Sequence, residues 1–282
     1  MSIRTDLAVE ITENNNYKGV TSKKSTKSDL TVTETEIISE EAAHQIGKPK
    51  GKYITLTSDT TLNTHSNQFY ERARVLSEVI IELINGAENI LVVGLGNREI
   101  TPDRLGVDTS EHIFATRHIH NLAPDLVTEN MSKVSVLSPG VMGETGIETA
   151  EAVGAIVKSV LPDAVIVVDS LACAELDNLA KTIQLTDTGI SPGSGVQNSR
   201  AELSKSTLGV PTIAIGVPTV VDMQTIAEHI FKQKADKSYR SLSVAPKDID
   251  RIISRASKLI SSGINLALFP SLTLEEINSL VE

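Results

Sequence analysis

The sequence predicts an α/β protein with a mainly parallel sheet, helices on both faces and a small N-terminal β-rich addition. Two fully apolar runs, residues 90–93 and 164–168, are typical of parallel strands that are buried on both faces. Apolar residues recur at helical spacing before and after these runs, over residues 69–84 and 147–161. Because strands and helices alternate along the chain, we expect the strands to pair in parallel.

The first 60 residues have a different character from the rest. Residues 1–28 are polar and lack sustained periodicity, which predicts an exposed or loosely held segment. Residues 30–38 alternate as an exposed edge strand would, residues 40–46 predict a short helix, and residues 52–57 a second strand. We therefore expect residues 1–60 to form a β-rich extension packed on an α/β domain of residues 61–282, as one structural unit.

The main domain follows in alternating order. Asn85 and Gly86 end the helix of residues 69–84, and the strand of residues 90–93 comes next. The remaining predicted elements are a helix at 103–114, a strand at 134–137, a helix at 147–161, a strand at 164–168, a Gly/Ser/Thr-rich stretch at 181–200, a strand at 211–215, and helices at 222–231, 248–261 and 274–281.

Composition restricts the class of protein. The formal net charge of -10 argues against a protein that tracks nucleic-acid phosphates. Cys173 is the single cysteine, so it forms no internal disulfide, and its alanine neighbours indicate a packed side chain. The sequence shows no signal peptide and no apolar run near the ~20 residues of a membrane helix. We expect a cytoplasmic protein with no membrane association.

Two aspartates share one context. Asp103 follows the apolar run 90–93, with Thr101 and Pro102 predicted to begin a helix, and Asp169 directly follows the run 164–168. If these strands are neighbours, both carboxylates lie at the carboxyl edge of the sheet. A close pair rarely ionises fully, so one carboxylate can act as base and the other as acid. The alternatives are that Asp103 favours a helix dipole and that Asp169 caps a helix through Glu175.

Two glycine-rich loops suggest a different function, the binding of a phosphate. Gly94 and Gly96, and the Gly-Ser-Gly of residues 193–195, could cradle a phosphate. The first loop lacks the third glycine of a dinucleotide fingerprint, and neither ends as a P-loop does, which favours tight turns. Ser194 lacks the strand-to-elbow context of a hydrolase nucleophile, so we do not predict it to be catalytic.

Three histidines, His112, His118 and His120, lie close together in the sequence. Their spacing does not match a metal site, so we predict neither a metal nor a cofactor. Arg117 and His118 could instead contact a carboxylate of a substrate, and the alternative is a structural ion pair.

Several segments together resemble the germination protease family of spore-forming bacteria. The matching stretches are residues 4–10, 47–56, 92–106, 116–118, 139–149, 169–172, 182–195 and 208–222, among them Pro-Gly-Val-Met-Gly, Thr-Pro-Asp and Val-Asp-Ser-Leu-Ala. They run in family order over most of the chain.

The resemblance implies an endopeptidase that degrades small acid-soluble spore proteins during germination, in the spore core or forespore. It further implies a fold similar to that of the hydrogenase-maturation proteases, a homotetramer, and two essential aspartates that correspond to Asp103 and Asp169. Asn97, Thr101, His118 and Asp187 are candidates for orienting the site. A metal-reading maturation-type protease and a nucleotide-binding regulatory module remain as alternatives.

The sequence departs from the family pattern at two places. Family members are typically zymogens whose propeptide ends just before a Ser-x-Arg-Thr-Asp-Leu segment, whereas only Met1 precedes Ser2 here, which puts zymogen control in doubt. The stretch between residues 231 and 248 is also shorter than in larger relatives.

The segment of residues 5–10 resembles the sequence that the family cuts in its substrates. Asp6 takes the place of the first acid of that motif, and Leu7 the place of the apolar residue after it. We therefore expect this segment to act as a weak pseudosubstrate that is slowly cut between Asp6 and Leu7. The alternative is that Leu7 and Val9 pack as an edge strand.

Overall fold

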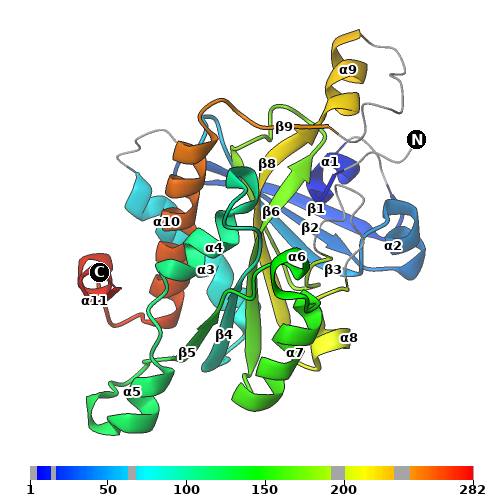
Figure 1. The fold of residues 1–282 in the computed structure, drawn as a ribbon. Helices are drawn as coiled ribbons and strands as arrows, with labels where there is room; N and C mark the ends of the chain where they lie inside the picture. Colours follow the sequence, from blue (N-terminus) through cyan, green and yellow to red (C-terminus); the bar gives the residue numbers. More distant parts are fainter. Residues whose placement is uncertain (1–4, 14–16, 63–67, 192–200, 232–241, 282) are drawn as a thin grey trace.

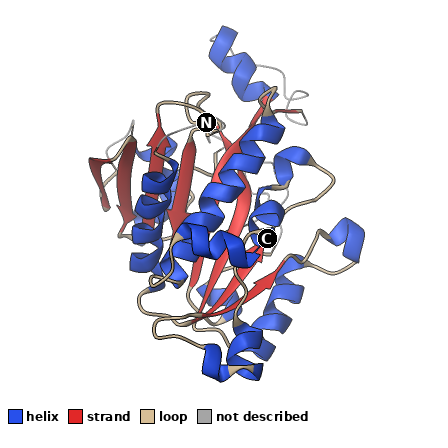
Figure 2. Cartoon of the chain, turned by 90° about the vertical axis from the view of Figure 1, so that its left-hand side faces the viewer, coloured by secondary structure: helices blue, strands red, loops and turns tan. Residues whose placement is uncertain are grey.

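A computed structural model describes residues 5–13, 17–62, 68–191, 201–231 and 242–281. One mixed sheet of nine strands crosses the described part of the chain, with helices against both faces (Figures 1 and 2). The spatial order is β1-β2-β3-β7-β8-β6-β4-β5, and β9 pairs with β8. The strands are β1 Val20–Lys27, β2 Leu30–Ile37, β3 Gly51–Ser58, β4 Asn89–Gly94, β5 Lys133–Leu137, β6 Ala164–Cys173, β7 Thr182–Thr186, β8 Thr212–Asp222 and β9 Ser243–Val244.

The sheet has a parallel half and an antiparallel half. β5, β4, β6 and β8 pair in parallel, whereas β1, β2, β3 and β7 form an antiparallel series that joins β8 through β7. The predicted α/β class is confirmed; the sheet is mixed, because the N-terminal strands and β7 extend its parallel half by antiparallel pairs. β8 is the strand at which the two halves meet.

Two helical layers cover the sheet. The long helices α3 Phe69–Ile84 and α10 Ile249–Leu268 pack on one face, and α7 Thr149–Val160 packs on the other. The remaining helices are α1 Ala8–Thr12, α2 Glu40–Ile46, α4 Leu105–Glu111, α5 Arg117–Leu122, α6 Met142–Thr145, α8 Lys205–Leu208, α9 Met223–Phe231 and α11 Leu274–Val281, with 3-10 turns η1 Thr101–Asp103 and η2 Pro124–Leu126.

Successive side chains of a strand point to opposite faces of the sheet, so one strand can pack against a helical layer on each face. In β4, Ile90 and Val92 lie in the core with α3 and α10, whereas Leu91 and Val93 lie in the core with α7. All four side chains are fully buried, as the unbroken apolar run predicts. The run carries no polar residue because neither face of the central strand meets water.

The N-terminal prediction was wrong in one respect. Residues 20–27, predicted as part of an exposed or loosely held segment, are mostly exposed but form the edge strand β1, so β2 is an inner strand. The sequence of β1 gives no apolar alternation because most of its side chains are exposed. Its position is set by pairing along its whole length with β2, which places Lys23 opposite Glu34.

Two further strands were misjudged from the sequence. β6 does not end at residue 168 but continues through Asp169 to Cys173, and β8 runs to Asp222 rather than to residue 215. The two strands pair with one another along this extra length. Residues 182–186, predicted as part of a Gly/Ser/Thr-rich stretch, form β7 between β3 and β8.

Candidate active site

Asp103 ends the 3-10 turn η1, in the connection that folds back on itself after β4. The backbone N–H of Asn97 donates to Asp103 Oδ2 at 2.9 Å, and this bond fixes the carboxylate against the start of the loop. Gly96 has φ +114°, and a Cβ there would lie 1.7 Å from the carbonyl oxygen of Asp103. The close approach requires glycine at position 96, because any side chain would displace Asp103.

Asp169 lies within β6 and is 5% exposed. By strand alternation it follows Val165 and Val167 on the face that carries α7. Its Oδ1 accepts the backbone N–H of Ser170 at 2.8 Å. The interpretation of Asp169 as the cap of a helix through Glu175 is wrong, since the chain there remains a strand to Cys173.

A backbone hydrogen bond ties the two aspartates' segments together. The N–H of Leu95, which begins the loop to Asp103, donates at 2.9 Å to the carbonyl of Val168, which precedes Asp169. Gly106 allows this closeness, because a Cβ there would lie 2.2 Å from the carbonyl oxygen of Val168. The end of β4 and the start of α4 therefore lie directly against β6.

Asp103 and Asp169 line one cavity of about 440 Å³. Apolar residues, including the half-exposed Ile100, and the polar residues Thr149, Ser170, Thr219 and Ser243 also line it. A mixed apolar wall with a few polar groups is typical of a ligand-binding site. Two acids in such a wall can serve as an acid/base pair.

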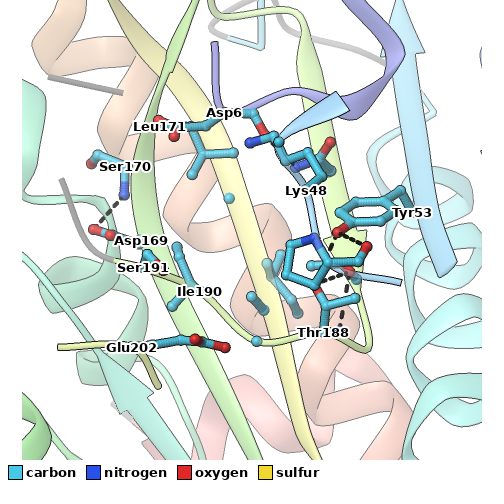
Figure 3. Close-up of a pocket in the computed structure, with 18 residues that line it drawn as sticks. Asp6, Lys48, Tyr53, Asp169, Ser170, Leu171, Thr188, Ile190, Ser191 and Glu202 are labelled. Carbon is cyan, nitrogen blue, oxygen red and sulfur yellow. Dashed lines mark hydrogen bonds between the residues drawn. The ribbon is translucent and has the colours of Figure 1, made fainter. Parts of the chain in front are cut away.

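A second cavity of about 140 Å³ lies beside the first and shares Asp6, Asp169, Ser170 and Leu171 with it (Figure 3). Lys48 and Tyr53 line its other side. Burial lowers the pKa of Lys48, and burial raises the pKa of Tyr53 to about 12. The Tyr53 hydroxyl donates to the carbonyl of Pro49 at 2.8 Å, so it is held as a neutral donor.

The N-terminal segment reaches both cavities through Asp6. The carbonyl of Asp6 accepts from Lys48 Nζ and from Gln184 Nε2, each at 3.0 Å. Leu7 is fully buried, and the residues that follow form the short helix α1 rather than an edge strand. The Asp6–Leu7 peptide bond therefore lies beside the cavities with its carbonyl already hydrogen-bonded.

The four supporting candidates lie in different places. Asn97 contacts Asp103 through its backbone, and its side chain accepts the N–H of Glu99 at 2.8 Å. Thr101 begins η1, whose next two residues line the larger cavity. His118 is exposed on α5, and Asp187 Oδ1 accepts the N–H of Lys52 at 2.8 Å, so neither belongs to the wall of either cavity.

The loop with Gly94 and Gly96 is filled by the protein itself. A Cβ on Gly94 would lie 2.1 Å from the carbonyl oxygen of Gly106, and Gly96 abuts Asp103. These glycines admit neighbouring backbone rather than a phosphate, which favours tight turns over the nucleotide-binding alternative. Ser194 and the second glycine-rich loop lie outside the described residues.

Other predicted groups take structural positions. Cys173 is fully buried and burial raises its pKa, as expected for a packed thiol. Across the described ranges, no three His, Cys, Asp or Glu side chains gather as a metal site would require. No helix in the described part of the chain is long and apolar enough to cross a membrane.

Several polar residues that line the larger cavity were not predicted from the sequence. Thr149, Ser170 and Thr219 come from α7, β6 and β8, which meet only in the folded sheet. Ser170 had one signal, its place directly after Asp169. Thr149 and Thr219 had none beyond lying in stretches that resemble the family.

The fold and the site define an α/β protein with a pair of acids in one cavity at the sheet. The family model for germination proteases matches residues 2–233, and the chain belongs to that family. The germination protease of Clostridium perfringens is 38% identical over 98% of this chain and 98% of its own length. That of Clostridium tetani is 39% identical over 99% of each chain, and that of Bacillus cereus is 42% identical over 80% of this chain and 65% of its own.

Among solved structures, a [NiFe] hydrogenase maturation protease from Thermococcus kodakarensis covers 66% of this chain and 98% of its own. It is 16% identical, and the TM-score is 0.36.

Proposed function

We propose that this spore-germination protease is an endopeptidase that degrades small acid-soluble spore proteins and that uses Asp103 and Asp169 as its catalytic pair. The observation that carries the proposal is that both carboxylates line one cavity. The family match and the relatives that span nearly the whole chain support the protease class.

The pair would act on a peptide carbonyl that is bound between the two acids. The ionised carboxylate takes a proton from water, whose oxygen attacks the carbonyl carbon, while the protonated carboxyl donates its proton to the carbonyl oxygen. Collapse of the tetrahedral intermediate breaks the C–N bond: the carboxyl that took the proton from water gives it to the leaving amine, and the other carboxylate takes back the proton from the former carbonyl oxygen. Both aspartates are thus required, each in a different protonation state.

The surroundings suit an extended peptide. Apolar residues that line the same cavity, Leu95, Ile100 and Leu171 among them, offer surfaces for side chains of a substrate. Since Ile100 is 52% exposed, one edge of the cavity is open to a macromolecular substrate.

The test is incubation of the purified protein with a small acid-soluble spore protein, followed by mass mapping of the products. We expect cleavage by the wild type and its loss in Asp103→Asn and in Asp169→Asn, both of which should unfold at the wild-type temperature. Asp125→Asn, at an exposed acid of η2, serves as the matched control and should cleave normally. Full activity in either active-site variant would overturn the two-aspartate assignment.

The assembly and location of the enzyme belong to the same proposal. We infer a homotetramer that acts in the spore core or forespore, supported by the family resemblance. Light scattering on the eluted protein tests the first part, since a monomer at working concentration would contradict it.

A further inference from the structure

The backbone groups of β6 face its two neighbouring strands in turn. The N–H of Val165 donates at 2.9 Å to the carbonyl of Pro211, which precedes β8, whereas the carbonyl of Val168 accepts from Leu95, which follows β4. Because this direction alternates along a strand, odd-numbered residues of β6 bond toward β8 and even-numbered residues toward β4. The pairing with β4 ends at Val168. Beyond it, the even-numbered residues of β6 face an edge that no described strand covers.

One residue on this edge lies between two occupied positions. Val168 is bonded to the start of the loop after β4, and Ala172 exchanges two hydrogen bonds with Asp6. Ser170 lies midway between them. Its N–H donates to Asp169 Oδ1 at 2.8 Å, but its carbonyl accepts no hydrogen bond from any residue that the structure describes. Backbone carbonyls within a sheet are normally paired, so this acceptor is available to a bound group.

The same stretch of edge borders the cavity of the two acids. Asp169 and Ser170 point to opposite faces of the sheet, yet both line this cavity, so the cavity reaches around the edge of β6. Leu95 and Asp6, the neighbours at the two ends of the open stretch, line it as well. Among the ten residues of β6, Ser170 alone is not buried. Its carbonyl therefore lies where a peptide in the cavity can reach it.

We propose that the substrate binds as an added strand at the open edge of β6 and that one of its backbone N–H groups donates to the carbonyl oxygen of Ser170. Addition to an exposed strand edge holds an extended peptide by its main chain, whatever its side chains are. The inference rests on the proposed peptidase function and deepens it, because it gives the conformation in which the substrate lies beside Asp169. The open stretch has room for one such hydrogen bond, between Leu95 and Asp6.

The first test scans a spore-protein peptide that spans a mapped cut site with single esters. Each ester replaces one backbone N–H by oxygen and leaves every side chain unchanged, and the bond to be cut stays an amide. Successive N–H groups of an extended peptide face opposite sides, so we expect one sensitive position within about two residues of the cut. There kcat/KM should fall about tenfold or more, and at the nearest esters on either side it should fall less than about twofold. The all-amide peptide is the reference.

The second test is a crystal structure of the full-length Asp103→Asn variant with the all-amide peptide. We expect a backbone N–H of the peptide within about 3.2 Å of the Ser170 carbonyl oxygen, at the position that the ester scan finds sensitive. A sensitive N–H that donates to another group instead would overturn the assignment to Ser170.

The outcomes separate this inference from the proposed function. If the wild type cleaves the peptide but tolerates every ester within about twofold, or if the bound peptide lies away from the edge of β6, strand addition is overturned and the peptidase stands. If the wild type cleaves no spore protein, both fall.

Discussion

Asp6 and Ala172 hold one another by two hydrogen bonds, one in each direction. The N–H of Asp6 donates to the carbonyl of Ala172 at 2.9 Å, and the N–H of Ala172 donates to Asp6 Oδ2 at 2.8 Å. The N-terminal segment is thereby fixed to the end of β6, three residues beyond Asp169. A displacement of the N-terminal segment would therefore be transmitted to Asp169 through the backbone of β6.

The proposed self-cleavage between Asp6 and Leu7 makes a prediction about rate. Because Leu7 is fully buried, the segment must leave its place before the bond can enter the cavity, so trimming should be slow. Asp6→Glu should speed it, and Asp6→Lys should stop it, as followed by N-terminal sequencing over time. A fully active enzyme that keeps an intact N-terminus in both the wild type and the Glu variant would refute the idea.

Glu10 should contribute strongly to stability. This buried carboxylate accepts the N–H groups of Ala174 and Glu175, at 2.8 and 3.0 Å, and Asn178 Nδ2 at 2.8 Å. Glu10→Ala leaves these donors unpaired and should lower the free energy of unfolding by about 1–3 kcal/mol, as measured by urea denaturation. Glu13→Ala, at an exposed ion pair with Lys24, should change it by less than about 0.5 kcal/mol.

Gly96→Ala should damage the candidate site directly. The new Cβ meets the carbonyl of Asp103, and the positive φ is strained for alanine, so both stability and cleavage should fall. Gly154→Ala in α7 is the control, because nothing lies within 4 Å of its Cβ position. That helical substitution should stabilise by roughly 0.5–1 kcal/mol and leave cleavage unchanged.

Asp29 should contribute to the way in which the stability of the fold depends on pH in the acidic range. Its hydrogen bonds from the buried Arg72 hold the pKa of the carboxyl below its ordinary value. A lowered folded-state pKa stabilises the protein above the unfolded value, and this contribution is lost as the pH falls through the folded value. Asp29→Asn should therefore destabilise at neutral pH, and the difference from wild type should shrink below pH ~4 in thermal melts.

The rate of cleavage should be bell-shaped in pH. Both aspartates are needed in different protonation states, so activity should fall when the pair loses its shared proton or gains a second one. Initial rates of peptide cleavage across buffers of constant ionic strength measure the profile. A rate that stays flat across the acidic and neutral range would argue against the acid pair.

The two apolar runs are the features of the sequence from which the central strands and the place of the aspartates could be predicted. Four aliphatic residues at 90–93 and five at 164–168 predict two strands buried on both faces, and the aspartates that follow them line one cavity. The continuation of β6 through Asp169 was not predictable, because it depends on pairing with β8 some fifty residues later. Local sequence around Asp169 reads equally well as a strand end or a helix cap.

β8 has a bulge at Thr219, where Leu171 pairs with Pro218 and Ala172 with Val220. This bulge could not be predicted from the sequence. A bulge is a mismatch between two strands, so neither strand encodes it alone. β1 was missed for a related reason: its side chains face water, and only its ladder to β2 makes it a strand.

The pairing order of the sheet has a consequence for the protein as it is made. A nascent chain that ends near residue 200 already contains Asp103 and Asp169, but it lacks β8, the strand that joins the parallel and antiparallel halves. Without β8, the end of β6 has no neighbour on that side, and the cavity has no wall from Thr219. At a translation rate of about 5–20 residues per second, an interval of seconds separates the synthesis of the second acid from that of β8. The order of synthesis thus keeps the ribosome-bound chain from completing the candidate site before β8 joins the sheet.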